Sequence, residues 1–291
     1  KNFSKLGIET GDVKLNLDKM MKNKEKAVSI LTKGVEFLFK KNKVTYLKGF
    51  GSFVSDKKIS VKGEDGKKKE IEAKNIIIAT GSEAMPMPNV EFDEKTIVSS
   101  TGALSLKEVP KSLVVVGGGY IGLEMGSVWS RLGAEVNVIE FLDHITPGMD
   151  REISEEFMKI LKKQNIKFHL NRKVTSIKKT NNGVQISTSD KNGDSKDFNC
   201  DVALISIGRK PFTSNLNLSS AGVKSDEKGR IKIDKKFQTS AKNIYAIGDV
   251  IDGPMLAHKA EEEGIAVAEI IAGQSGPVSY THLTLPTTIE V

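Results

Sequence analysis

The sequence of 291 residues contains only one cysteine, Cys200. A single thiol excludes a disulfide within the chain and any redox chemistry that needs two of its own cysteines. The four histidines are scattered, which argues against a zinc site built from several Cys and His ligands. Long apolar runs are missing too, since none approaches the ~18 residues that indicate a membrane span. We therefore expect no metal site, no membrane association and no disulfide chemistry inside this chain.

Arginine is absent from the first quarter of the chain, where lysine is abundant. Residues 1–75 hold 19 Lys and 10 acidic residues, a net charge of +9, against +7 for the whole chain. A basic segment can mark nucleic-acid binding. Here the lysines alternate with apolar residues such as Leu15, Leu17 and Met20, without interleaved aromatic residues and without the Arg forks that hold phosphates. We therefore expect a solvated face and no nucleic-acid partner.

The apolar pattern predicts an α/β fold. Residues 18–42 are expected to form one amphipathic helix with Asp18 as its N-cap. Short alternating runs over 44–73 predict a β-meander, whose first strand covers 44–47. The apolar run 76–79 then predicts a strand that is buried on both faces.

The same order of elements recurs further along the chain. The repeated elements are a helix over 151–164, alternating strands across 173–199 and an apolar strand over 202–207. The second series ends at Gly208, 127 residues after Gly81, which closes the first. This recurrence indicates an internal duplication of a dinucleotide-type unit. Only the second copy opens with a strand and a glycine-rich turn, over 113–124. That difference and the missing start Met predict a fragment of a longer protein.

The most specific local motif is a glycine-rich turn after an apolar strand. Its residues are Gly117-Gly118-Gly119-Tyr120-Ile121-Gly122, followed by Leu123 and Glu124. Gly117 allows a tight turn, Gly119 lets the backbone approach a pyrophosphate, and Gly122 lets the following helix pack on the strand. The pyrophosphate would lie at the N-terminus of that helix, where N–H groups and the helix dipole favour anions.

An acidic residue follows this turn at the spacing of a dinucleotide site. The helix is expected to end before Gly133, and the next strand, 136–139, ends at Glu140, 21 residues after Gly119. An acid about 20 residues after the glycines binds ribose hydroxyls in such sites. It would also repel a 2′-phosphate, and residues 141–146 contain no Arg or Lys, which favours NAD over NADP. The alternative is an ordinary strand–turn–helix with a surface acid.

A second motif lies near the C-terminal end. A short apolar strand, 243–247, ends at Gly248-Asp249, and a helix is expected over 256–272. Such an Asp can accept hydrogen bonds from sugar or ribityl hydroxyls, and the helix N-terminus can face an electron-rich ring. The alternative is an Asp at a turn beside a helix cap.

These motifs together resemble the dihydrolipoamide dehydrogenases, which are flavin disulfide oxidoreductases. The resemblance runs from the start to about Gly273. It is carried by residues 78–82, 117–124, 126–129, 138–141, 207–213 and 243–261. The match is closer to this family than to the glutathione or mercuric reductases of the same fold. Dehydrogenases that bind NAD alone would not need both the strand ending at Gly81 and the strand ending at Asp249.

The resemblance implies two cofactors and a set of contacts for each. The family passes electrons from protein-bound dihydrolipoyl groups through a reactive disulfide to FAD and then to NAD. The FAD contacts implied are Gly51, Thr80, Gly81, Ser82, Asp249, Met255, Leu256, Ala257 and His258. The NAD contacts implied are Gly117, Gly118, Gly119, Tyr120, Ile121, Gly122, Leu123, Glu124, Glu140, Val174 and Gly208.

The resemblance also implies a domain plan, partners and a location. Residues 1–108 would be the latter part of an FAD domain, 109–233 a complete NAD domain with a Rossmann-like sheet, and 234–276 a return to the FAD domain. The expected partners are lipoyl domains of 2-oxo acid dehydrogenase or glycine cleavage complexes, and a second copy in a homodimer. The expected location is the bacterial cytoplasm, or the mitochondrial matrix in a eukaryote.

Parts of the family pattern are missing from this sequence. The reactive Cys pair, the first FAD glycine motif and the interface domain with the family's catalytic His and Glu are absent, so no catalytic residue is assigned. We also expect 277–291, which contain no Lys or Arg, to be a non-native end; a divergent tail is the alternative. The alternatives for the chain as a whole are a free-standing NAD-binding module and a related flavin disulfide reductase.

The remaining conspicuous side chains have structural interpretations. Cys200 is expected to be a core residue. Trp129 is expected to pack within the protein rather than to stack on a cofactor. His144 and His169 are expected to lie at the surface or to pack with their ring nitrogens hydrogen-bonded. Glu124 either caps the first turn of its helix or contacts the nicotinamide side of the cofactor.

Overall fold

The computed structural model describes residues 7–9 and 11–274, and the chain divides into two compact units. Unit 1 comprises the described residues up to Val44 together with Ala84–Gly208, and unit 2 comprises Thr45–Glu83 together with the described residues from Arg209 onward. These units divide the chain at other positions than the domain limits expected from the sequence: the described residues up to 44 and residues 84–108 group with unit 1, and 209–233 group with unit 2. The predicted non-native end at 277–291 lies outside the described residues.

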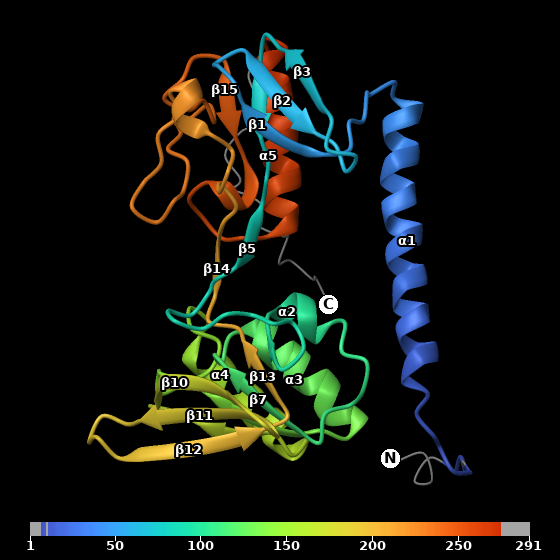
Figure 1. The fold of residues 1–291 in the computed structure, drawn as a ribbon, viewed down its shortest axis with the longest axis vertical. Helices are drawn as coiled ribbons and strands as arrows, with labels where there is room; N and C mark the ends of the chain where they lie inside the picture. The colour runs from blue at the N-terminus through green and yellow to red at the C-terminus, as the bar shows by residue number, and fades with distance from the viewer. Residues whose placement is uncertain (1–6, 10, 275–291) are drawn as a thin grey trace, which may run out of the picture. The chain divides into compact units, whose positions relative to one another are not determined.

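A five-stranded parallel sheet forms the centre of unit 1 (Figure 1). In spatial order its strands are β6 (Ile97–Val98), β13 (Val202–Ile205), β7 (Ser112–Val116), β8 (Glu135–Ile139) and β9 (Lys167–His169). Every neighbouring pair is parallel. β7 and β13 are almost continuous runs of Val, Ile, Leu and Ala, as expected for strands that are covered on both faces.

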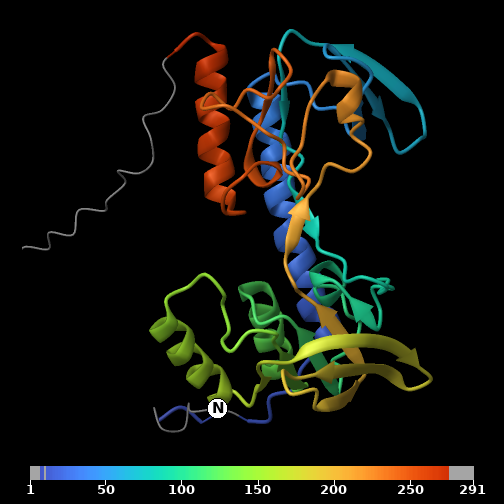
Figure 2. The ribbon, with the colours of Figure 1, turned by 90° about the vertical axis from the view of Figure 1, so that its left-hand side faces the viewer.

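Different layers cover the two faces of this sheet. On one face lie α2 (Ser100–Ala103), α3 (Tyr120–Leu132) and α4 (Arg151–Lys163), with Leu113 and Val115 pointing into the core beneath them. An antiparallel meander covers the other; its strands are β10 (Lys173–Thr180), β11 (Gly183–Ser189) and β12 (Ser195–Cys200). Figure 2 shows this order, with the green helices to the left of the sheet and the yellow meander to its right.

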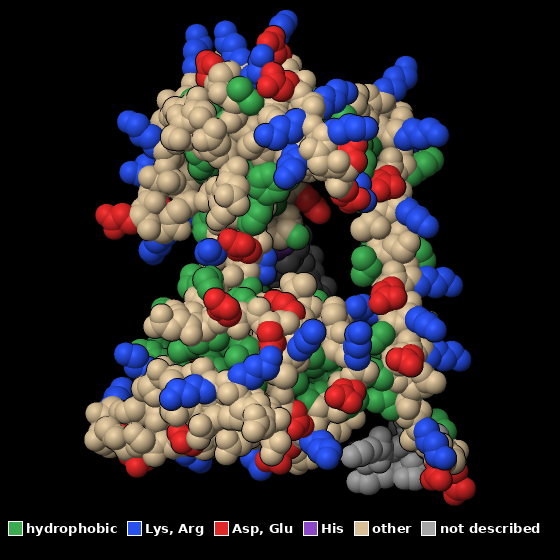
Figure 3. Space-filling model, viewed as in Figure 1, with side chains coloured by type: hydrophobic (Ala, Val, Ile, Leu, Met, Phe, Trp, Pro, Cys, Tyr) green, Lys and Arg blue, Asp and Glu red, His purple; other side chains and the backbone are tan. Residues whose placement is uncertain are grey.

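The first helix, α1 (Leu17–Lys41), confirms the predicted helix but not its predicted cap. Asn16 is the N-cap, because its side chain accepts a hydrogen bond from the Lys19 N–H; Asp18 lies in the first turn instead, where its charge favours the helix dipole. No residue of α1 is buried, and lysines alternate along it with exposed apolar side chains (Figure 3).

Unit 2 contains a second meander and a parallel strand pair. The meander strands are β1 (Phe50–Phe53), β2 (Lys58–Lys62) and β3 (Lys68–Glu72); the parallel pair is β4 (Ile76–Ile78) and β15 (Ile244–Ala246); β5 (Ser82–Ala84) pairs with β14 (Arg209–Pro211). The 3-10 helices η2 (Leu218–Ala221) and η3 (Gly248–Val250) and helix α5 (Ala257–Ile271) complete it. The strand expected over 44–47 is wrong, since the first strand begins at Phe50.

The expectation that the strand at 76–79 is buried on both faces is also wrong. Ile76 and Ile78 are buried in the core of unit 2, but Ile77 is 41% exposed. Ile77 lies opposite Tyr245 in the parallel pair, and α5 packs over that neighbour through Val267. The helix therefore covers the β15 side of this face and leaves Ile77 partly open.

The same order of elements occurs twice along the chain, which agrees with the predicted duplication. The first series begins with α1, which groups with unit 1, and the second begins with α4; each helix is followed by a three-stranded antiparallel meander that leads into a parallel strand ending near a glycine of positive φ, Gly81 or Gly208. The α/β class expected from the sequence is confirmed.

Candidate functional site

The glycine turn of unit 1 connects β7 to α3, and its first glycine is fixed by sterics. Gly117 has φ +106°, a conformation that L side chains rarely adopt, and a Cβ there would lie 2.5 Å from the carbonyl oxygen of Ser206. Gly122 is equally restricted, because its Cβ would lie 2.6 Å from the Gly117 oxygen and also meet the Ser206 hydroxyl. These two residues allow α3 to pack tightly against β7 and the loop after β13.

Gly119 differs from both neighbours because it faces open space. No heavy atom lies within 4 Å of the position that its Cβ would occupy, and its φ of −74° is ordinary. It is the N-cap of α3, and no side chain caps this end of the helix. The first-turn N–H groups and the positive end of the helix dipole are thus directed at an uncovered surface, which is the arrangement that binds a pyrophosphate.

Glu140 follows β8 beside this turn and is 8% exposed. Its Oε2 accepts a hydrogen bond from the Gly118 N–H at 2.6 Å, and its Oε1 accepts one from the Leu142 N–H at 2.8 Å. Both oxygens are thus held by backbone donors. A carboxylate has about four lone-pair positions, so acceptor capacity remains for two sugar hydroxyls. The residues of this turn fit a dinucleotide whose ribose carries no 2′-phosphate.

The other residues expected to contact NAD have different surroundings. Tyr120 is exposed on the first turn of α3, whereas Leu123 is buried in the core. Glu124 is exposed, and the capping role considered for it is not observed at the described N-terminus of α3. Val174 packs among core residues on β10, so a cofactor contact there would have to come from its backbone. Gly208, with φ +134°, follows β13.

A second group of predicted residues meets in unit 2. β4 and β15 are parallel neighbours, so their carboxyl ends lie at the same edge and bring Thr80, Gly81 and Ser82 next to Asp249. The Ser82 hydroxyl donates to Asp249 Oδ2 at 2.5 Å. Gly81 has φ +73° and no heavy atom within 4 Å of its Cβ position. This edge therefore has a carboxylate, a hydroxyl and an open glycine side by side, a combination that suits a polyhydroxyl chain.

Arg209 belongs to this edge, although it had no predicted role. Its Nε donates to the Ser82 hydroxyl at 2.7 Å and its Nη2 donates to the Ser82 carbonyl oxygen at 2.6 Å. The guanidinium thereby fixes the residue that contacts Asp249. The sequence offered one indication, an arginine directly after the glycine that ends an apolar strand, but its partner Ser82 lies 127 residues away.

The remaining residues expected at FAD divide into two groups. Met255, Leu256, Ala257 and His258 form the approach to α5 and its first turn. Leu256 is the N-cap without a side-chain hydrogen bond, which leaves the helix dipole uncapped there. Gly51 is an ordinary strand residue of β1, paired with Val61.

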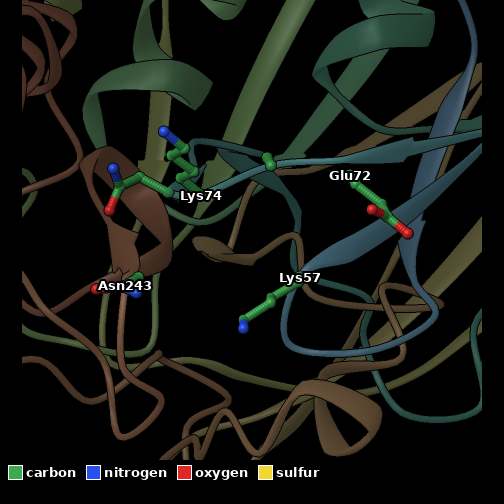
Figure 4. Close-up of a pocket in the computed structure, with 6 residues that line it drawn as sticks. Lys57, Glu72, Lys74 and Asn243 are labelled. Atoms are coloured by element: carbon green, nitrogen blue, oxygen red, sulfur yellow. The ribbon is translucent and has the colours of Figure 1, made fainter.

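An open pocket in unit 2 lies away from these residues. It is lined by Lys57, Glu72, Ala73, Lys74, Asn75 and Asn243. Asn75 and Asn243 precede β4 and β15, so the pocket lies at the amino ends of the strands, opposite the Asp249 edge. In Figure 4 the side chains of Lys57, Glu72 and Lys74 point in different directions and do not converge on one ligand position.

The other polar candidates have structural surroundings. Trp129 is buried and donates from Nε1 to the Ala103 oxygen at 3.1 Å. Burial raises the pKa of the Cys200 thiol to about 12, so it is a poor nucleophile. His169 packs edge-on against Phe198 and contacts Asn137 Oδ1 at 2.9 Å through Nε2, while His144 contacts Asp143.

The described residues contain neither a cluster of metal ligands nor a candidate membrane span. No three His, Cys, Asp or Glu side chains among them are arranged to hold a metal ion. Within the same part of the chain, no helix is both long and apolar enough to cross a membrane.

Comparison with known proteins gives consistent matches. The sequence model of the pyridine nucleotide-disulphide oxidoreductases matches residues 4–264. The chain is 52% identical over 280 residues to the mitochondrial dihydrolipoyl dehydrogenase of Pisum sativum, covering 96% of this chain and 56% of the relative. It is 55% identical over 276 residues to the dihydrolipoamide dehydrogenase of Chaetomium thermophilum, covering 94% and 55%. The chain thus spans about half the length of these relatives.

A solved structure agrees with the fold. The flavoprotein disulfide reductase RclA of Escherichia coli superimposes with a TM-score of 0.79 at 28% sequence identity. The match covers 91% of this chain and 59% of that protein. The similarity therefore extends over both compact units.

Proposed function

Because this chain belongs to the pyridine nucleotide-disulphide oxidoreductase family, we propose that it is the flavin-to-NAD portion of a dihydrolipoyl dehydrogenase. The family uses FAD and NAD. The observation that carries the proposal is Glu140, whose carboxylate is held between the Gly118 and Leu142 N–H groups beside an open glycine turn. Identities of 52% and 55% to dihydrolipoyl dehydrogenases support the choice within the family.

The reaction proposed for the whole protein is the oxidation of protein-bound dihydrolipoyl groups. Electrons would pass through a disulfide and FAD to NAD, and the single Cys200 means that this chain does not supply the disulfide. The proposed partners are the lipoyl domains of 2-oxo acid dehydrogenase or glycine cleavage complexes, and a second copy in a homodimer. The names of relatives from a plant and a mammal favour the mitochondrial matrix over the bacterial cytoplasm.

Toward NAD, the proposed contacts use the glycine turn and Glu140. The pyrophosphate would lie over Gly119 at the N-terminus of α3, where uncapped N–H groups donate to it. Glu140 would accept hydrogen bonds from the ribose hydroxyls and repel a 2′-phosphate. Residues 109–233 remain the proposed NAD domain.

Toward FAD, the proposed contacts lie at the edge formed by Ser82 and Asp249. When bound, FAD would supply the two-electron redox chemistry that links thiols to the nicotinamide. Asp249 would accept hydrogen bonds from the ribityl hydroxyls, with Thr80, Gly81 and Ser82 along the same chain. The N-terminus of α5 would direct its positive dipole end at the flavin ring and so stabilise negative charge there. Residues 1–108 and 234–276 remain the proposed FAD portions.

The variant Glu140→Arg tests the NAD assignment. We expect NADH affinity to fall about tenfold to a hundredfold, because a charge-assisted hydrogen bond to the ribose is lost. NADPH affinity should fall less, or rise, because the guanidinium attracts the 2′-phosphate. Fluorescence titration of the purified chain with both nucleotides measures the two affinities.

Glu140→Gln is the matched control, since its amide oxygen can still accept from the Gly118 N–H. We expect it to weaken NADH less than the Arg variant does and to leave NADPH discrimination partly intact. An NADH-to-NADPH affinity ratio that is the same in wild type and Glu140→Arg would remove Glu140 from the ribose site.

A further inference from the structure

Glu263 is a buried carboxylate that none of the proposed cofactor contacts uses. It lies on α5 and is 7% exposed. Its Oε2 accepts a hydrogen bond from the Gly248 N–H at 2.7 Å, and its Oε1 forms an ion pair with Lys259 Nζ at 2.8 Å. A carboxylate is removed from water only at a large cost unless it is paired and hydrogen-bonded, and both conditions are met here.

The partner of this carboxylate is the residue directly before Asp249. Gly248 is held at both of its backbone polar groups, since Glu263 accepts from its N–H and Lys259 donates to its carbonyl oxygen at 3.4 Å. Its φ is +73°, and a Cβ there would lie 3.1 Å from the Ala260 Cβ. The turn from β15 into η3 is therefore pressed against α5 and bonded to it.

Helix stability does not explain the pair of Lys259 and Glu263. A lysine in the first turn of a helix opposes the helix dipole, which favours acidic residues there. A lysine four residues before a glutamate is also the weaker order for an i,i+4 pair. These two unfavourable placements nevertheless put both charges within reach of the backbone N–H and carbonyl groups of Gly248.

We propose that Glu263 is a positioning residue for Asp249. With Lys259 it holds Gly248 in its left-handed conformation, so that the next side chain is directed at Ser82 and at the open edge beside Gly81. Removal of the Glu263 carboxylate would free the turn and let Asp249 leave this position. The consequence for a cofactor rests on the proposed function, in which Asp249 binds the ribityl chain of FAD.

The first test needs no cofactor and measures amide hydrogen exchange by NMR on the full 291-residue chain, labelled with ¹⁵N. In Glu263→Leu we expect exchange at Gly248 to accelerate about tenfold or more, because its N–H loses a charge-assisted acceptor. The Ile247 amide, which donates to the Ile78 oxygen, should change by less than about twofold, since β4 and β15 stay paired. Glu263→Gln keeps a neutral acceptor oxygen but loses the ion pair with Lys259, so its exchange at Gly248 should lie between that of Glu263→Leu and that of wild type.

Two control variants separate positioning from general stability. Val267→Ala removes buried volume from the same helix without touching Gly248, and Glu261→Gln removes a charge at an exposed position of α5. Neither variant should accelerate amide hydrogen exchange at Gly248 relative to exchange at Ile247. Equal Gly248-to-Ile247 exchange ratios in Glu263→Leu and Val267→Ala would overturn the proposal.

The second test measures FAD affinity of the same chain from the quenching of flavin fluorescence. We expect Glu263→Leu to bind FAD about tenfold more weakly than Val267→Ala does, with partial rescue by Glu263→Gln. Accelerated Gly248 exchange with unchanged FAD affinity would contradict positioning. If FAD affinity is the same in wild type and Asp249→Asn, the proposed FAD contact fails, while the exchange ratios still decide whether Glu263 holds the turn.

Discussion

At the scale of single residues, two buried glutamates hold the two glycine turns. Glu140 accepts from the Gly118 N–H in unit 1, and Glu263 accepts from the Gly248 N–H in unit 2. In both cases a carboxylate far along the chain satisfies a backbone donor that a tight turn leaves without a ladder partner. Charge-assisted bonds of this kind are about twice as strong as neutral ones, so each acid fixes its turn as well as presenting charge.

His169 provides a pH-dependent test at the same scale. Burial lowers the pKa of its imidazole, and the positive charges of Lys196, Arg172 and Lys167 lower it further. The unfolded chain therefore takes up a proton near the ordinary value of 6.5, while the folded chain resists it. The stability contribution of this neutral histidine is complete above that value and declines as the pH falls below it.

We therefore expect the melting temperature to fall less in His169→Gln than in wild type between about pH 7.5 and about pH 5.5. His258→Gln is the matched control, because it makes the same replacement at an exposed histidine. Thermal melts followed by circular dichroism at both pH values measure the difference. Identical pH dependence in wild type and His169→Gln would contradict the assignment.

At the scale of elements, the junction of β7 and α3 depends on glycines that have different tasks. Gly117 and Gly122 are required by contacts with Ser206 and with each other, so they serve folding. Gly119 meets nothing within 4 Å and has an ordinary φ, so folding does not require it. An open glycine at an uncapped helix N-terminus agrees with the proposed pyrophosphate contact, in which the ligand approaches the backbone.

This distinction predicts opposite effects for two alanine variants. Gly119→Ala should lower the free energy of unfolding by only about 1 kcal/mol, because a good N-cap residue is lost. It should weaken NADH binding by about tenfold or more, because the new Cβ would occupy the space proposed for the pyrophosphate. Gly122→Ala should cost about 3 kcal/mol, because its Cβ overlaps fixed backbone. Urea denaturation and NADH titration of each variant separate the two effects. Wild-type NADH affinity in Gly119→Ala would contradict the placement of the pyrophosphate.

At the scale of the whole molecule, the two units differ in the residues that they offer to a cofactor. Unit 1 has a complete sequence of strand, glycine turn, helix and acid from β7 to Glu140. Unit 2 has the edge of Ser82 and Asp249, but the chain contains only one G-x-G-x-x-G turn, at Gly117 to Gly122. A second pyrophosphate therefore has no glycine turn of its own in this sequence.

The expected behaviour of the isolated chain follows from this inequality. It should bind NADH weakly, retain FAD poorly and show no dihydrolipoamide-dependent reduction of NAD, because it has one cysteine and that thiol is buried. Absorbance at the NADH band, followed with purified chain, added FAD and dihydrolipoamide, measures the turnover. Turnover above the rate of a heat-denatured control would contradict the expectation.

Local patterns were enough to predict much of the fold and the NAD turn. The helix at α1, the three-stranded meanders and the run from β7 to Glu140 each depend on periodicity or spacing within a short window. Three details were wrong: Asn16 rather than Asp18 caps α1, the first meander strand begins at Phe50 rather than at 44, and Ile77 is left partly open by α5. The individual cofactor contacts assigned by resemblance stay predictions, and Val174 and Leu123 are core residues whose side chains carry no visible indication of a ligand.

The sequence by itself determined the α/β class, the glycine turn with its acid 21 residues later and the absence of an internal disulfide, because each is a property of residue types at short or countable separations. Only the tertiary structure decided which groups distant in sequence form hydrogen bonds with one another. It brought Arg209 to Ser82, Ser82 to Asp249 and Glu263 to Gly248. Hydrogen bonds act over about 3 Å, so partners far apart in sequence become recognisable only once the sheet has brought them together.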